Sequence, residues 1–343
     1  MKSLRLILLA SLLATSPAPA DDWPAWMGAD RKGVWAEDGI IETFPEGGPK
    51  VLWRTPIHHG YSGPAVVGDR VYVMDRKLAD PADSPNNPFE RGEIPGNERV
   101  LCLDASSGKI IWEHAYDCAY TVSYASGPRA TPTVDGDHVY TLGAEGDLLC
   151  LAASDGTVKW SHNFKKLFGI NAPTWGFTGS PLVDGDLLIC LAGGDATTAV
   201  AFDKLSGEQR WTELTAKEPG YAPPKIIEHG GRRLLIIWHP ESVNALDPKT
   251  GEIQWSVDWP LRSGLSVATP RLHGDRLFFS CFYNGSMMLE LKGDNSEPEI
   301  LWRTERASEN PARTTHLHGI MSTANLTDDH IFGEGSNGEF RCL

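Results

Sequence analysis

Short apolar runs separated by tight-turn residues recur along the chain from about residue 60 onward. In each unit a glycine-containing turn joins two apolar stretches, and turns of this kind need the positive φ angle that glycine adopts freely. The pattern therefore predicts a series of β-hairpins and few helices. The clearest copies read SGPAVVGDRVYV (62–73), ATPTVDGDHVYTL (130–142), GSPLVDGDLLICL (179–191) and ATPRLHGDRLFFS (268–280).

A second motif alternates with the hairpins and ends in tryptophan. In four copies an apolar residue precedes the Trp by nine positions and a glycine precedes it by four, and a fifth copy carries two extra residues. The unit of about 45 residues has the size of a propeller blade. The tryptophans are Trp112, Trp160, Trp211, Trp255 and Trp302, and the glycines are Gly108, Gly156, Gly207 and Gly251.

The repeat predicts an all-β fold, a β-propeller of four-stranded blades, with about six blades represented. An open β-solenoid is the alternative, but its rungs are usually shorter and lack a Trp in every unit. A residue that recurs once in every repeat is expected to have a structural role in each blade. We therefore expect the Trp side chains to pack across the seam to the next blade. The six cysteines follow the repeat and are expected mostly as small buried residues without disulfides.

The two ends of the chain define its organisation. Residues 1–20 combine basic Lys2 and Arg5 with a short apolar stretch and an Ala18-Pro19-Ala20 site, the pattern of a cleaved signal peptide. No Cys follows, so a lipid anchor is not indicated. We expect an N-terminal extension over 21–49 and the propeller over 50–343, in a protein that is periplasmic or secreted, monomeric and without a membrane span.

The last Trp motif begins at Phe340 and the sequence stops before its Trp. The early Val51-Leu52-Trp53 stretch resembles the outer strand of a blade whose other strands come from the C-terminus. We therefore expect the last blade to be incomplete, the chain to be C-terminally truncated, and the complete ring to hold seven or eight blades.

Net charge narrows the set of partners. The 343 residues carry a formal charge of −14 and no dense basic cluster, so the chain repels phosphate backbones and anionic lipid. Nucleic acid is not an expected partner. The expected partner is an envelope protein or a small ligand.

The repeat pattern apolar-Asp-x-x-Ser/Thr-Gly-x-x-x-Trp resembles that of the pyrroloquinoline-quinone (PQQ) propellers. Asp247, Thr250, Gly251 and Trp255 match it fully. The stretch from Asp22 to Gly28, with Arg31 and Gly33 after it, is similar to the opening of secreted bacterial PQQ-like repeat proteins, although Met27 stands where Arg is usual. The resemblance covers residues 22–343 and implies the propeller fold.

The resemblance leads to two functional branches. PQQ-dependent alcohol and sugar dehydrogenases bind Ca²⁺ through Glu, Asn and Asp and use an Asp base; the alcohol dehydrogenases add a vicinal disulfide. No motif places these residues here, and the chain has no adjacent cysteines. The other branch comprises non-catalytic scaffolds such as the BamB type. Those proteins are usually lipoproteins, so neither branch matches fully.

Candidate site residues come from the loops before each inner strand, because such loops converge at the mouth of a propeller channel. Trp175 and Tyr221 either stack on a sugar or quinone ring or pack at the blade tops. His316 and His318 either make hydrogen bonds in a loop or, with a third ligand, bind a metal. The candidates are Tyr61, Tyr124, Arg129, Trp175, Phe177, Tyr221, His316 and His318.

The expected function is an exported, non-catalytic scaffold that binds a protein or other ligand in the cell envelope, without a catalytic residue or a metal. A PQQ- and Ca²⁺-dependent oxidoreductase and a carbohydrate-binding propeller are the alternatives. A fold does not fix a function, so these hypotheses depend on the site.

Overall fold

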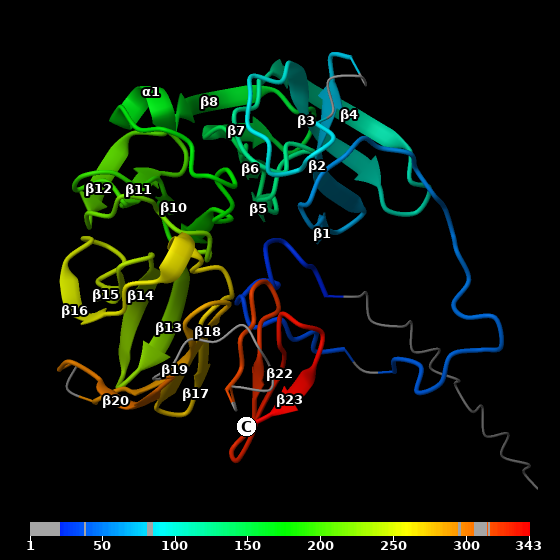
Figure 1. Ribbon diagram of the computed structural model, residues 1–343. Helices are drawn as coiled ribbons and strands as arrows, with labels where there is room; N and C mark the ends of the chain where they lie inside the picture. Colours follow the sequence, from blue (N-terminus) through cyan, green and yellow to red (C-terminus); the bar gives the residue numbers. More distant parts are fainter. Residues whose placement is uncertain (1–20, 38, 81–84, 294–295, 305–313, 315) are drawn as a thin grey trace, which may run out of the picture.

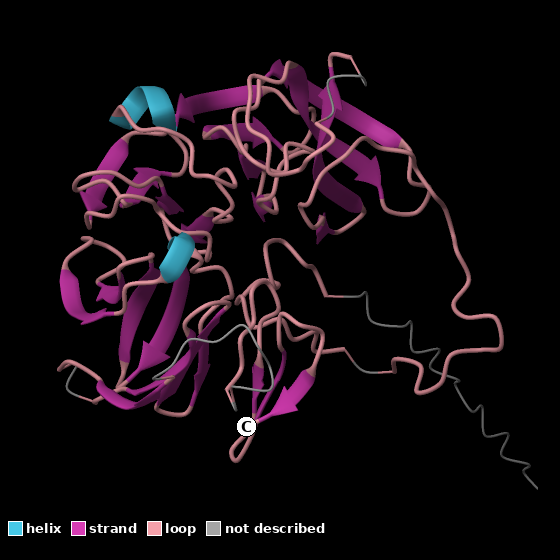
Figure 2. Ribbon diagram, viewed as in Figure 1, coloured by secondary structure: helices cyan, strands magenta, loops and turns pink. Residues whose placement is uncertain are grey.

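The computed structural model describes residues 21–37, 39–80, 85–293, 296–304, 314 and 316–343. The expected signal peptide at 1–20 lies outside the described residues. The described part of the chain contains antiparallel sheets arranged around a central axis (Figures 1 and 2). The predicted β-propeller is thereby confirmed, with six blades represented.

Each blade is a meander in which neighbouring strands pair antiparallel. Blades 1 to 3 are β1 (Ala65–Val67), β2 (Arg70–Leu78), β3 (Gly96–Asp104) and β4 (Ile110–Asp117); β5 (Thr133–Asp135), β6 (His138–Leu142), β7 (Asp147–Ala152) and β8 (Val158–Asn163); and β9 (Leu182–Asp184), β10 (Leu187–Leu191), β11 (Ala199–Asp203) and β12 (Gln209–Glu213). Blades 4 to 6 are β13 (Lys225–His229), β14 (Arg232–Trp238), β15 (Ser242–Leu246) and β16 (Ile253–Asp258); β17 (Arg271–His273), β18 (Arg276–Cys281), β19 (Gly285–Glu290) and β20 (Glu299–Arg303); and β21 (Asn325–Leu326), β22 (Ile331–Glu334) and β23 (Phe340–Cys342). The helical elements described are α1 (Phe164–Phe168) and a 3₁₀ turn, η2 (Arg262–Gly264).

The middle strands of the blades are buried on both faces. In β10, Leu188 and Cys190 belong to the cluster shared with blade 2, whereas Ile189 and Leu191 belong to the cluster shared with blade 4. Successive strand residues point to opposite faces of a sheet, so one strand supplies two cores. This explains why these strands are apolar at consecutive positions. Five of the six cysteines are buried and none forms a disulfide, while Cys342 is exposed.

A β-bulge sits in front of the tryptophan in each four-stranded blade. Cys102 pairs with Trp112 but the next residue, Leu103, pairs with Ile110, so Ile111 is the extra residue. A bulge of this kind bends the strand and changes the direction of the following side chain. Equivalent register shifts follow Cys150, Ala201, Ala245 and Met288.

The tryptophan side chains lie across the seams between blades. The indole of Trp112 donates from Nε1 to the carbonyl oxygen of Ala153 at 3.0 Å and lies over Gly156. Trp160 and Trp211 lie over Gly207 and Gly251 in the same way. Trp53 repeats the arrangement ahead of blade 1, since its indole covers Gly108 and donates to the carbonyl of Ala105 at 2.8 Å. The motif glycine is therefore the floor on which the preceding blade's indole rests.

Candidate functional site at the propeller channel

Tyr61, Tyr124 and Arg129 come together in the loops that precede β1 and β5. The Arg129 guanidinium donates to the backbone carbonyls of Ser123 at 2.7 Å and Tyr124 at 2.6 Å. It also lies 5.3 Å from the centre of the Tyr61 ring, which is 51% exposed. Burial lowers the pKa of Arg129. Arg129 therefore holds the shape of its own loop, and Tyr61 is the member of this group that faces solvent.

A long loop between β2 and β3 extends this surface. The ring of Phe89, 62% exposed, meets Tyr124 edge-on with centroids 5.1 Å apart. The amide of Ser123 donates to the carbonyl of Thr174 at 2.8 Å, which ties the loop before β5 to the loop before β9. The loops of blades 1 to 3 thus form one connected surface with aromatic side chains on it.

Trp175 and Tyr221 form a second aromatic pair, with ring centroids 5.7 Å apart and an edge-to-face angle of 69°. Tyr221 is buried, and the desolvation raises the pKa of its hydroxyl. Its backbone amide donates to Ser266 at 2.8 Å, so the pair connects the loops before β9, β13 and β17. Trp175 is the partly exposed member of this pair.

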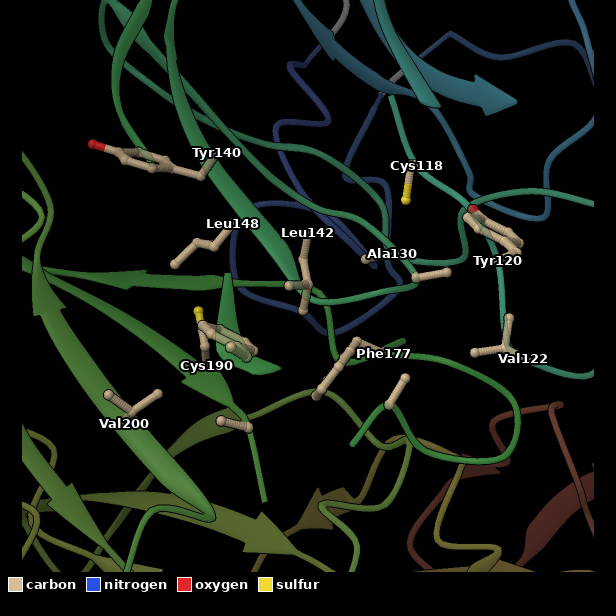
Figure 3. Close-up of a cluster of buried hydrophobic side chains, with 14 of the residues drawn as sticks. Cys118, Tyr120, Val122, Ala130, Tyr140, Leu142, Leu148, Phe177, Cys190 and Val200 are labelled. Carbon is tan, nitrogen blue, oxygen red and sulfur yellow. The ribbon is translucent and has the colours of Figure 1, made fainter. Parts of the chain in front are cut away.

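The structure places Phe177 in the hydrophobic core. Its ring is 1% exposed and meets Phe164 edge-on, with centroids 5.6 Å apart. Figure 3 shows Phe177 among Leu142 and Cys190 in the cluster between blades 2 and 3. A contact with a ligand at the mouth would require this ring to leave the core.

His316 and His318 make different contacts. His318 is buried, and its two ring nitrogens contact the carbonyl of Phe282 at 2.7 Å and the hydroxyl of Thr314 at 2.9 Å. His316 stacks on Trp302 at 5.5 Å and lines a cavity of about 440 Å³ between blades 5 and 6. Burial lowers the pKa of His318, which keeps its ring neutral at pH 7. The pair behaves as two loop histidines with separate partners.

The chain's own N-terminal segment, residues 22–33, lies along the propeller axis (Figure 1). It touches blade 1 where Trp23 and Val66 exchange backbone hydrogen bonds of 2.7 and 2.9 Å. It touches blade 2 where the amide of Val134 donates to the carbonyl of Pro24 at 2.8 Å. Blade 5 is reached by Trp26, whose Nε1 donates to another side chain, the hydroxyl of Thr269, at 3.0 Å.

Arg31 makes the contacts with blades 3 and 4. Its guanidinium donates to the carbonyl oxygens of Ser180 at 3.1 Å, Pro224 at 2.9 Å and Pro181. The side chain is only 2% exposed, and burial lowers its pKa. These carbonyls lie just ahead of the inner strands, whose axis-facing edge has no further strand in the sheet to accept from or donate to. The planar fork of Arg31 satisfies acceptors on two blades at once.

Two further cations hold the end of the segment. Lys225 donates from Nζ to the carbonyl of Arg31 at 3.0 Å, and Arg271 donates to the carbonyl of Lys32 at 2.5 Å. Lys225 and Arg271 begin β13 and β17, so they occupy equivalent places in adjacent blades. Burial and the neighbouring cations lower the pKa of Lys225 to about 8.

A sequence profile of the family described as outer membrane protein assembly factor BamB matches residues 37–162 and 96–343. The chain belongs to this BamB family. The solved structure of BamB from Moraxella catarrhalis has a TM-score of 0.54 and 16% identity, with 85% of this chain and 74% of that one covered. The comparison with curated protein sequences gave no match.

The BamB-family fold is shared with quinoproteins. Quinohemoprotein alcohol dehydrogenase from Comamonas testosteroni has a TM-score of 0.58 at 14% identity, over 91% of this chain. The present chain spans 57% of that enzyme's length. At 16% and 14% sequence identity, the similarity to these two structures shows a shared fold and nothing further.

In this BamB-family chain, residues 22–33 hydrogen-bond Val66 and Val134 on the inner strands of blades 1 and 2, and carbonyls just ahead of the inner strands of blades 3 and 4. Over the described residues, no three His, Cys, Asp or Glu side chains are gathered as metal ligands. Within the same part of the chain, no helix has the length and apolar character needed to cross a membrane.

In the sequence, residues 22–33 indicated only a family resemblance, and their place in the channel was not predicted. The available signal was composition: Trp23, Pro24, Trp26 and a lone Arg31 stand upstream of the first repeat, where a simple linker would be polar. Such a mixture of aromatic, rigid and cationic residues suits a segment that packs.

Proposed function

We propose that this BamB-family chain is an exported scaffold that binds a protein partner in the cell envelope through the loops at the mouth of its propeller. The observation that carries the proposal is the position of residues 22–33 on the axis, where they hydrogen-bond blades 1 to 5. A partner would therefore meet the loops at the mouth before it met the channel wall. Export rests on the signal-peptide pattern of residues 1–20.

The composition of the mouth suits a polypeptide partner. Tyr61 and Phe89 present exposed aromatic rings, and aromatic residues are enriched in protein interfaces. Backbone hydrogen bonds and the Arg129 fork fix the loops beneath them, so little conformational entropy is lost on binding. The net charge of −14 favours a partner with a basic surface. The buried position of Tyr221 gives no support to carbohydrate stacking.

Site-specific photocrosslinking tests the proposal. A photoreactive phenylalanine analogue replaces Tyr61 or Phe89 in one sample and the exposed Phe44 in a control, and crosslinked envelope proteins are identified by mass spectrometry. We expect one partner to be captured from Tyr61 and Phe89 and not from Phe44. Equal capture from all three positions would contradict a mouth-specific interaction.

A further inference from the structure

The N-terminal segment is folded to a shape that fits the channel. Its turn closes through a hydrogen bond of 2.8 Å from the amide of Gly33 to the carbonyl of Met27. Four residues of the segment have positive φ: Met27, Gly28, Arg31 and Gly33. A Cβ atom on Gly28 would lie 3.2 Å from the Trp23 ring, so glycine serves both the turn and the packing there.

The segment makes at least one hydrogen bond with each of the five four-stranded blades. Blades 1 and 2 pair with its backbone, whereas blades 3, 4 and 5 receive the side chains of Arg31 and Trp26. Arg31 in particular has positive φ, a conformation that costs an L residue about 1 kcal/mol. The channel contacts must offset both this strain and the desolvation of the guanidinium.

We propose that residues 22–33 are a built-in axial ligand of the propeller, with Arg31 as its anchor, and that they take the place in the channel that a quinone would need. The carbonyls of Ser180, Pro181 and Pro224, just ahead of the inner strands of blades 3 and 4, form a guanidinium site that the chain itself fills. The proposed function draws on the same position of residues 22–33, but this inference does not depend on which partner binds at the mouth.

The anchor is tested with Arg31→Ala and Arg31→Lys, beside Arg54→Ala as the matched control at an exposed arginine. Lysine keeps the charge but not the fork, so Arg31→Lys should fall between Arg31→Ala and wild type. We expect Arg31→Ala to lower the melting temperature by roughly 5–10 °C, since several charge-assisted hydrogen bonds are lost. It should also raise hydrogen exchange at residues 179–184 and 222–229 at least tenfold.

An unchanged exchange rate in these strands, with Arg31→Ala melting like Arg54→Ala, would overturn the proposal. If Arg31→Ala does not fold, Trp26→Phe supplies the same test on blade 5, because it removes only the indole donor to Thr269. Faster exchange confined to residues 268–273 is then the supporting result, and unchanged exchange there is the contradicting one.

A peptide added in trans separates recognition from stability. A synthetic peptide of residues 21–34 is added to the folded Arg31→Ala protein, and a second peptide carries the same Arg31→Ala change. We expect the native peptide to restore slow exchange in β9 and β13 and the altered peptide to have no effect. Equal effects of the two peptides would remove Arg31 as the anchor. Neither readout requires a partner protein, so failure here is distinguishable from failure of the proposed function.

Discussion

The Trp112 indole on the outer strand of blade 1 lies so close to Gly156 of blade 2 that a Cβ atom on this glycine would stand 2.6 Å from Cε3. Real Cβ contacts are not this short, so the seam admits only glycine. The same pairing joins blades 2 and 3 through Trp160 and Gly207. The repeated Gly and Trp positions therefore meet a packing requirement that acts between neighbouring blades.

We predict that Gly156→Ala destabilises the protein by about 3–5 kcal/mol, because the methyl group displaces the indole. Gly136→Ala is the matched control: Gly136 also has positive φ, but no atom lies within 4 Å of its Cβ position. It should cost only about 1–2 kcal/mol, the backbone penalty alone. Urea denaturation of the two variants measures the difference, and equal losses would contradict a steric seam.

The tryptophans at the seams differ in their indole hydrogen bonds, and this difference allows two substitutions to be compared. Trp112 donates to Ala153, whereas the Nε1 atom of the equally buried Trp211 has no hydrogen-bond partner among the described residues. Phenylalanine removes the donor at both sites, so Trp112→Phe should lose about 1 kcal/mol more than Trp211→Phe. Thermal melts at one protein concentration compare them. A larger loss at Trp211 would disprove the assignment.

The lowered pKa of Lys225 should make the stability of the protein depend on pH. Its pKa falls from 10.5 in the unfolded chain to about 8 in the folded one. The unfolded state therefore binds more protons between these values, and this contribution raises stability by about 3 kcal/mol at most as pH rises from 8 to 10.5. As the pH rises over this range, the melting temperature of wild type should increase relative to that of Lys225→Met. The exposed Lys50→Met serves as control, and parallel curves for wild type and both variants would contradict the shift.

Substitution of an exposed aromatic residue at the mouth should weaken partner binding without lowering the stability of the fold. Once a partner is identified by crosslinking, Phe89→Ala should weaken its affinity at least tenfold, since exposed aromatic anchors dominate interface energies. Phe44→Ala, at an equally exposed aromatic, should leave the affinity unchanged. Calorimetric titration gives both affinities. A common weakening by the two substitutions would indicate a non-specific apolar contact.

Most of the fold could be predicted from the sequence because each blade repeats the same local rules. The Asp–Gly hairpins and the Gly–Trp spacing are short-range signals, and Trp112 and Gly156 carry them without reference to distant residues. The site is different in kind. Phe177 and Tyr221 occupy loop positions like Tyr61 in sequence, and only the packing of neighbouring blades separates buried rings from exposed ones. Arg31 finds acceptors that lie 149 to 193 residues away, a relationship that no local pattern contains.

The proposed axial ligand would leave no place for a quinone in the channel, and isothermal titration calorimetry of the purified chain with PQQ in the presence of Ca²⁺ tests this directly. We predict no saturable heat of binding and no hydrogen-exchange change in residues 22–33. Stoichiometric PQQ binding, accompanied by faster exchange in that segment and by dye reduction with an alcohol or sugar donor, would contradict both the axial ligand and the non-catalytic function.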